Sequence, residues 1–210
     1  AYTYALPEVN SVTYDSANNK IIVTYRDAGN SQYGTAVVGT ISGTSISFGS
    51  PVVYNSGSTS QNSATFDPVA EKVVVIYSND ASNYAGSAKI GTVSGTSISF
   101  GSVVTFTSSA TFNTAPVFDT ASGKVVVFFS DSDAGDLGKA IVGTVSGTSI
   151  SFGSAVTFYS SALSYVTCAY DSANEKTIVS YRGQGNSGGK ARVGTVSGTS
   201  ISFGTEATYT

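Results

Sequence analysis

One phrase of 13 residues recurs four times along this chain of 210 residues. The copies read VGTISGTSISFGS, IGTVSGTSISFGS, VGTVSGTSISFGS and VGTVSGTSISFGT, beginning at Val38, Ile90, Val142 and Val193. They lie 52 residues apart, except that the last is one residue closer. A fixed period of this length indicates one structural unit that is repeated and that buries its apolar face against its neighbours. The chain is therefore constrained to an array of four like units.

Each unit is expected to form four antiparallel strands. A short strand ends in Asp, a tight turn ends in Lys, and a second strand follows, as in VTYDSANNKIIVTY. A variable loop leads to a third strand, and SGTS turns the chain into a fourth. No segment shows a helical period, and every apolar run is rich in strand-forming residues. The turn aspartates are predicted to accept backbone N–H groups: Asp15, Asp67, Asp119 and Asp171.

The second strand decides between folds, because runs such as VVVIY and VVVFF are apolar on both faces. A strand in a one-sided sheet would alternate apolar with polar residues. A strand covered on both faces lies between two other sheets, as in a propeller. The predicted fold is therefore all-β: a β-propeller of four blades of about 52 residues, each a four-stranded antiparallel sheet. A parallel β-solenoid and a pair of β-sandwiches are the alternatives. The aromatic residues expected between blades are Phe48, Phe100, Phe152 and Phe203.

The whole of residues 1–210 is predicted to be one propeller domain, with repeat units at approximately 11–54, 63–106, 115–158 and 167–209. Residues 1–5 hold a spare strand end, since AYTY and the C-terminal EATYT both match the end of a fourth strand. Three roles are open to this segment. It latches the ring shut at the last blade, it pairs with a neighbouring chain, or the four units belong to a larger ring made by two copies.

The tandem GTVSGTSISFG blades resemble the β-propeller repeats of phage tail, fibre or other virion-surface proteins and of secreted bacterial proteins. The resemblance covers essentially the whole chain. It implies a propeller fold and an extracellular or virion location. It does not imply one activity, because propellers carry many unrelated functions.

Composition excludes several classes of function. Charged residues make up 11% of the chain and the net charge is −3, which argues against nucleic acid as the main partner. No stretch reaches the roughly 20 apolar residues that cross a bilayer, so no membrane insertion is expected. The single Cys168 allows no intrachain disulfide and is predicted to be a buried, unreactive thiol. The absence of His excludes Ser–His–Asp and Cys–His catalysis.

Variation between the units is concentrated on one rim of the predicted ring. The first and third turns share one end of each blade and change little, whereas the second turn and the link between blades vary freely. Binding residues are disproportionately found on loops that a rigid scaffold carries. The arginines suit carboxylates such as those of acidic sugars, or alternatively pair with Asp27 or a neighbouring blade. The candidate ligand-binding residues are Arg26, Asp27, Tyr33, Asp80, Tyr84, Tyr159, Tyr165 and Arg182.

One loop offers a candidate metal site. The sequence DSDAGDLG brings Asp131, Asp133 and Asp136 close together, and carboxylate oxygens are the ligands that Ca²⁺ prefers. The spacing does not match an EF-hand, and the other three loops lack the cluster. A solvated turn is the alternative, and no other cofactor is expected.

The predicted function is a non-enzymatic, extracellular or virion-associated binding module that recognises a glycan or surface polymer through the variable rim. The alternative is a structural subunit of a virion or filament that self-associates through residues 1–5 by edge pairing. A second alternative is a glycan-active enzyme. That alternative requires two acids across a cleft, and no pair among the 13 Asp and Glu residues is marked by its context.

Overall fold

The computed structural model describes residues 7–185 and 188–209 of the chain. Its 17 strands pair antiparallel and form one continuous sheet. A short 3-10 helix, η1 (Asp80–Ser82), interrupts one loop. The all-β prediction is therefore confirmed. The spare strand end at residues 1–5 lies outside the described residues.

The strands fall into four sets that we call repeats 1 to 4. Repeat 1 contains β1 (Pro7–Asp15), β2 (Lys20–Asp27), β3 (Tyr33–Ser42) and β4 (Ser45–Phe48). Repeat 2 contains β5 (Val52–Asp67), β6 (Lys72–Asn79), β7 (Ala85–Ser94) and β8 (Ser97–Phe100). Repeat 3 contains β9 (Val104–Asp119), β10 (Lys124–Asp131), β11 (Leu137–Ser146) and β12 (Ser149–Phe152). Repeat 4 contains β13 (Val156–Asp171), β14 (Lys176–Gly183), β15 (Gly189–Ser197), β16 (Ser200–Phe203) and β17 (Ala207–Tyr209).

Long strands carry the chain from one repeat to the next. The first part of β5 pairs with β3 of repeat 1, and its last part pairs with β6 of repeat 2. We therefore count the first parts of β5, β9 and β13, residues 52–58, 104–110 and 156–162, with repeats 1, 2 and 3. The change of partner falls between Ser58 and Thr59, and a bulge follows at once between Ser60 and Ser63, with Gln61 at a φ of 50°. A bulge inserts a residue, bends the strand and lets it change partners. The prediction of variable loops linking the blades is therefore wrong, because these segments lie inside the strands β5, β9 and β13.

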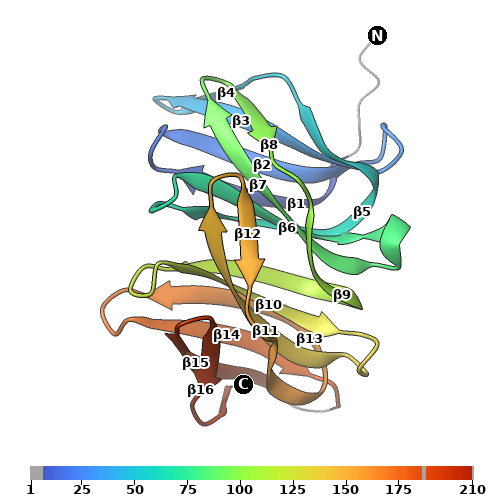
Figure 1. Cartoon of the computed structure of the whole chain (residues 1–210), viewed down its shortest axis with the longest axis vertical. Helices are drawn as coiled ribbons and strands as arrows, with labels where there is room; N and C mark the ends of the chain where they lie inside the picture. Colours follow the sequence, from blue (N-terminus) through green and yellow to red (C-terminus); the bar gives the residue numbers. More distant parts are fainter. Residues whose placement is uncertain (1–6, 186–187, 210) are drawn as a thin grey trace.

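The repeats are stacked in chain order along the long axis of the molecule, from repeat 1 at the top of Figure 1 to repeat 4 at the bottom. β1 packs beside β5, β5 beside β9, and β9 beside β13. In the described part of the chain, β1 pairs only with β2, and no strand of repeat 1 packs extensively against repeat 4. The predicted closed four-bladed ring is therefore wrong. Four repeats make three junctions, and the sheet stays open at both ends of the stack.

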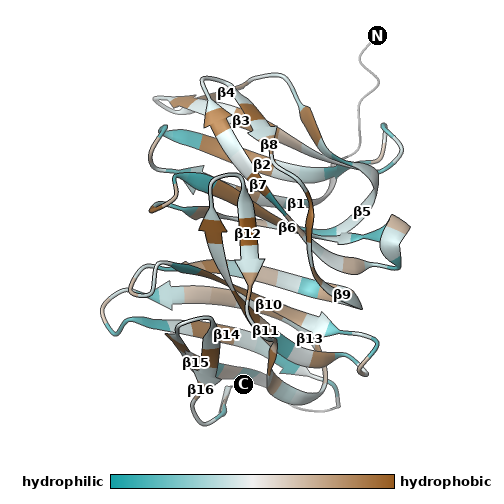
Figure 2. Cartoon of the chain, viewed as in Figure 1, coloured by the Kyte–Doolittle hydropathy of each residue, from teal (hydrophilic) through white to brown (hydrophobic). Residues whose placement is uncertain are grey.

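Each junction between repeats holds one hydrophobic core. The face of β2 with Ile22 packs against the face of β6 with Val73 and Val75. The next two junctions bury the equivalent faces in the same way. Hydrophobic segments accordingly lie along the strands, and many hydrophilic ones lie in the turns at their ends (Figure 2). Burial of these apolar faces is the main stabilising contribution in such a stack.

The prediction of second strands buried on both faces holds for the two inner repeats only. In β6 and in β10 six consecutive residues are buried. In β2 and in β14 buried and half-buried residues alternate, because no further repeat covers the outer face. The same reason corrects the aromatic prediction. Phe100, Phe152 and Phe203 pack against the junction cores, whereas Phe48 is 52% exposed.

The predicted turn chemistry is confirmed. The Oδ1 atom of Asp15 accepts hydrogen bonds from the backbone N–H groups of Ala17 and Asn18, both at 3.0 Å. The other three aspartates accept hydrogen bonds from N–H groups of their own turns in the same way.

Cys168 is half-buried, and its Sγ lies 3.4 Å from the carbonyl oxygen of Ala115. Burial raises the pKa of its thiol to about 12.

A close backbone approach at each junction gives a direct test of the stacking. A Cβ atom at Gly101 would collide with the carbonyl oxygen of Thr148 in the following repeat. At the equivalent Gly204 the nearest atom is the Val193 carbonyl oxygen, at 3.8 Å. We expect Gly101→Ala to lower the free energy of unfolding by about 1–3 kcal/mol, because overpacking forces the backbone to shift. Urea denaturation would measure this, with Gly204→Ala as the matched control. Equal effects of the two variants would contradict the junction geometry.

Candidate functional site

The predicted ligand-binding residues of repeat 1 lie near one end of its strands. Asp27 ends β2 and lies opposite Tyr33, which begins β3. Arg26 precedes Asp27 and lies opposite Gly34. The Asp27 carboxylate accepts a hydrogen bond from the N–H group of Gly29, at 3.1 Å. The structure brings these three residues to one strand end, and their role in binding stays a prediction.

The other predicted residues are distributed over three repeats. Asp80 in η1 accepts hydrogen bonds from Ser58 Oγ at 2.6 Å and Ser60 Oγ at 2.7 Å. The ring of Tyr84 lies 5.7 Å from that of Phe112. Tyr165 is 71% exposed and Arg182 is exposed on β14. Tyr159 alone among the eight lines the cleft described below.

The three aspartates proposed for calcium have separate partners. Asp131 Oδ1 accepts a hydrogen bond from Ala134 N, Asp133 Oδ2 from Ala110 N, and Asp136 Oδ1 from Ser132 Oγ. Across residues 7–185 and 188–209 there is no group of three or more His, Cys, Asp or Glu side chains placed to hold a metal ion. The geometry therefore lends the calcium prediction no support.

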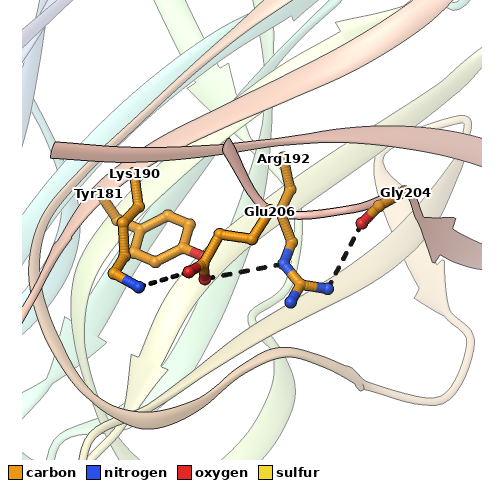
Figure 3. A network of polar contacts seen from close by, with 5 residues as sticks. All are labelled: Tyr181, Lys190, Arg192, Gly204 and Glu206. Atoms are coloured by element: carbon orange, nitrogen blue, oxygen red, sulfur yellow. Dashed lines mark hydrogen bonds and ion pairs between the residues drawn. The ribbon is translucent and has the colours of Figure 1, made fainter. Parts of the chain in front are cut away.

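A cluster of charged groups lies at the junction of repeats 3 and 4 and is centred on Glu206 (Figure 3). Lys190 Nζ donates to Glu206 Oε1 in an ion pair, and Tyr181 OH donates to Oε2 at 2.7 Å. Arg192 Nε lies 4.0 Å from Oε2, and Arg192 Nη1 lies 3.5 Å from the Gly204 carbonyl oxygen. The side chains of Lys190 and Glu206 are 15% and 22% exposed. The carboxylate is thus held firmly in the protein wall but reaches solvent.

Beside this network lies a polar cleft of about 420 Å³, which we call the Glu206 cleft. The centroid of the Tyr159 ring lies 5.0 Å from the centroid of the Tyr181 ring. Lys190 Nζ lies over the Tyr159 ring, 5.2 Å from its centroid. A cation over an aromatic face is attracted by the ring quadrupole and holds the ring in place. The lining residues are Thr157, Phe158, Tyr159, Ser160, Arg192 and Glu206.

Hydrogen bonds set the protonation of the cluster. The Lys190 ammonium, and then the Tyr181 hydroxyl, hold the pKa of the Glu206 carboxyl below its ordinary value. The hydrogen bond to Glu206 raises the pKa of Lys190. Burial, followed by the neighbouring Glu206, raises the pKa of Tyr181. At neutral pH the cleft therefore presents an ionised carboxylate, two cations and a protonated phenol.

The lowered pKa of Glu206 predicts a pH dependence of stability. A carboxyl group whose pKa is lower in the folded state stabilises the protein above its unfolded pKa of about 4.3, and this contribution is lost as the pH falls through the folded pKa. The difference in free energy of unfolding between wild type and Glu206→Gln should therefore be constant from about pH 6 to 8 and should shrink below about pH 4.5. Urea denaturation at several pH values would measure it. A difference that persists unchanged to the lowest pH would contradict the assignment.

Sequence reasoning missed Glu206, although a signal was available. The register of β17 against β15 places Glu206 where the other repeats have Pro51, Val103 and Ala155. Only repeat 4 has an acidic residue at this position, and the same repeat also contains Lys190 and Arg192. This combination was the signal for an ion-pair site in repeat 4. Both cations lie beside this carboxylate of their own repeat.

No known protein family and no curated protein matches the sequence. Among solved structures, the chain is similar to exo-β-1,3-galactanase from Phanerochaete chrysosporium in complex with β-1,3-galactotriose. The likeness has a TM-score of 0.56 at 8% sequence identity, and it covers 94% of this chain and 52% of the galactanase chain. The chain thus spans about half the length of that enzyme, and the likeness concerns the fold.

This comparison corrects the functional prediction. A non-enzymatic binding module was expected, whereas a solved structure that shares the fold is an enzyme with an oligosaccharide bound. The comparison gives no support to a phage or virion origin, which stays a prediction. In the part of the chain that the structure describes, no helix has the length and apolar character to span a bilayer.

Proposed function

We propose that this chain is a carbohydrate-active protein and that its saccharide site is the Glu206 cleft. The observation that carries the proposal is the ionised Glu206 carboxylate, held by Lys190 and Tyr181 in the wall of a polar cleft. The aromatic ring of Tyr159 and the hydroxyls of Thr157 and Ser160 complete the lining. Hydroxyl, carboxylate and guanidinium groups together supply the hydrogen-bond donors and acceptors that the hydroxyl groups of a saccharide bind. The fold shared with exo-β-1,3-galactanase supports a saccharide as that ligand.

The chemistry assigned to Glu206 follows from its charge. Cleavage of a glycosidic bond passes through a transition state in which the sugar ring becomes positively charged. An ionised carboxylate beside the ring stabilises that charge or attacks it as a nucleophile. The lowered pKa suits Glu206 to this role and not to the role of proton donor. Canonical enzymes pair such a carboxylate with a second, protonated carboxyl group, which donates a proton to the leaving oxygen. Glu206 is the one carboxyl group among the described residues that line the cleft, so in this proposal the leaving oxygen takes its proton from water.

The charge of the cleft favours a saccharide with an acidic substituent. Two cations, Lys190 and Arg192, face the single carboxylate of Glu206. Lys190 is occupied by the ion pair, whereas the contacts of Arg192 at 3.5 and 4.0 Å are long for hydrogen bonds. A guanidinium carries five N–H donors, so Arg192 has donors left for a carboxylate or sulfate group. An extracellular or virion location, where such polymers are met, is part of this proposal.

The test is a panel of neutral and acidic oligosaccharides, assayed for release of reducing ends and, by ligand-observed NMR, for binding. We expect wild type to cleave at least one acidic oligosaccharide and Glu206→Gln to lose the cleavage. Glu71→Gln, which changes an exposed carboxylate in a turn of repeat 2, is the matched control and should leave cleavage unchanged. Wild type that neither cleaves nor binds any member of the panel would overturn the proposal, as would full activity of Glu206→Gln.

A further inference from the structure

Every junction in the stack is built around the same three aromatic rings. At the first junction, Tyr54 of repeat 1 lies 5.4 Å from Tyr77 and 5.6 Å from Phe100 of repeat 2. The leading repeat thus supplies one ring and the following repeat supplies two. The same arrangement recurs at the other two junctions, with centroids 5.2 to 5.7 Å apart: Phe106 with Phe129 and Phe152, and Phe158 with Tyr181 and Phe203.

The two ends of the stack carry the complementary parts of a fourth such cluster. Repeat 1 presents Tyr25 and Phe48, at the positions of Tyr77 and Phe100. Repeat 4 presents Tyr209, at the position of Tyr54. Phe48 is 52% exposed and Tyr209 is 53% exposed. Within the described chain, Tyr25 and Phe48 at the repeat 1 end have no partner equivalent to Tyr54. The residue equivalent to Tyr54, Tyr209, lies at the repeat 4 end.

Aliphatic residues show the same division. Ile46 is 47% exposed on the outer face of repeat 1, whereas its equivalents Ile98, Ile150 and Ile201 are each 3% exposed. Val193 is 48% exposed on the outer face of repeat 4. Its equivalents are between 0% and 1% exposed: Val38, Ile90 and Val142. The residue types are alike, and in the described part of the chain no neighbouring repeat covers these two outer faces, which accounts for their exposure. We call them the repeat 1 face and the repeat 4 face.

The backbone is complementary in the same sense. In the three inner contacts, Gly49, Gly101 and Gly153 lie against the SGTS turn of the next repeat, where a side chain would not fit. Gly204 on the repeat 4 face has the same residue type, and no atom presses on it. The matching SGTS turn on the repeat 1 face, residues 42–45, is exposed. Contact between two repeat 1 faces, or between two repeat 4 faces, would not bring Tyr209 to Tyr25 and Phe48. Each aromatic cluster would then remain incomplete.

We propose that a second copy of this chain binds head to tail, with its repeat 1 face on the repeat 4 face of the first copy. Tyr209 then lies between Tyr25 and Phe48 of the second copy, as Tyr54 lies between Tyr77 and Phe100. Burial of exposed Ile46, Phe48, Val193 and Tyr209 drives the association. Each copy has one face of each kind, so the contact is heterologous. It closes into a ring of copies or extends into an open array.

The test measures molar mass by sedimentation over a range of micromolar concentrations. Wild type is expected to rise from 21.3 kDa to at least twice that mass. Ile46→Lys and Val193→Lys each place a charge on one face and should remain at the monomer mass. An equimolar mixture of the two variants should form a heterodimer, because one variant retains the repeat 4 face and the other retains the repeat 1 face. Val69→Lys, at a 75% exposed turn residue, is the control and should associate like wild type.

Two results would overturn the proposal. Wild type that stays at the monomer mass at every concentration shows that the faces do not bind each other. A single variant that still forms dimers shows contact between like faces or through another surface. Both substituted residues are exposed, so folding should be retained, and the unfolding midpoint of each variant checks this.

Discussion

Replacing Phe158 by alanine is expected to lower the free energy of unfolding by about 3–5 kcal/mol. Phe158 is 1% exposed and its ring contacts those of Tyr181 and Phe203 across the junction of repeats 3 and 4. Removing it leaves a cavity between two rigid sheets that cannot collapse easily, so the cost includes both lost burial and the cavity. Chemical denaturation of the purified variant would measure the change.

Tyr209→Ala is the matched control for this substitution. Tyr209 occupies the same position in the next repeat but is 53% exposed at the open end of the stack. Its loss should cost about 1 kcal/mol or less at protein concentrations where the chain is monomeric. Comparable losses in the two variants would mean that the end of the stack is covered, and the open architecture would be wrong.

The second large effect is expected from a charge between the inner repeats. Val75 in β6 is 0% exposed and lies in the core between repeats 1 and 2. Val75→Asp places an unpaired carboxylate in that core, which should cost about 3–5 kcal/mol. A loss of this size is comparable to the whole stability of many domains, so the variant is expected to be partly unfolded in buffer. Circular dichroism and urea titration would show it.

Val23→Asp makes the same change at the same position of repeat 1. Val23 is half-buried on the outer face of β2, where water reaches a carboxylate. The expected cost is therefore well below that of Val75→Asp, and the variant should remain folded. If Val23→Asp unfolds the chain as readily as Val75→Asp, then another surface covers repeat 1 in the monomer.

Much of the fold was accessible from the sequence because each repeat has strong local signals. The β-branched runs, the Asp turns and the SGTS turns predicted the strands, and the double-sided apolar runs predicted stacking of sheets. Closure of the ring could not be predicted. Val23 and Val75 occupy equivalent positions in similar β-branched runs, yet Val23 is half-buried and Val75 is fully buried. Burial of a repeat depends on how many neighbours it has and on the angle between them, and neither is written in a local pattern.

The candidate site was less accessible. Tyr159 was among the predicted binding residues, but Glu206 was not, because in sequence it lies on the far side of a turn from Lys190 and Arg192. Only the pairing of β17 with β15 brings them together. Tyr165 and Arg182 were chosen from variability, which marks tolerance to change as readily as binding. They lie on exposed strand positions outside the lining of the Glu206 cleft.

The open stack is tested most directly by the distance between its two ends within one chain. Spin labels at Ile46→Cys and Val193→Cys, in a Cys168→Ser background diluted with unlabelled protein, report this distance by dipolar spectroscopy. The labels lie on repeats at opposite ends of the long axis, so weak coupling at long range is expected (Figure 1). Strong short-range coupling between labels on one chain would show that repeats 1 and 4 meet, and would contradict the open stack.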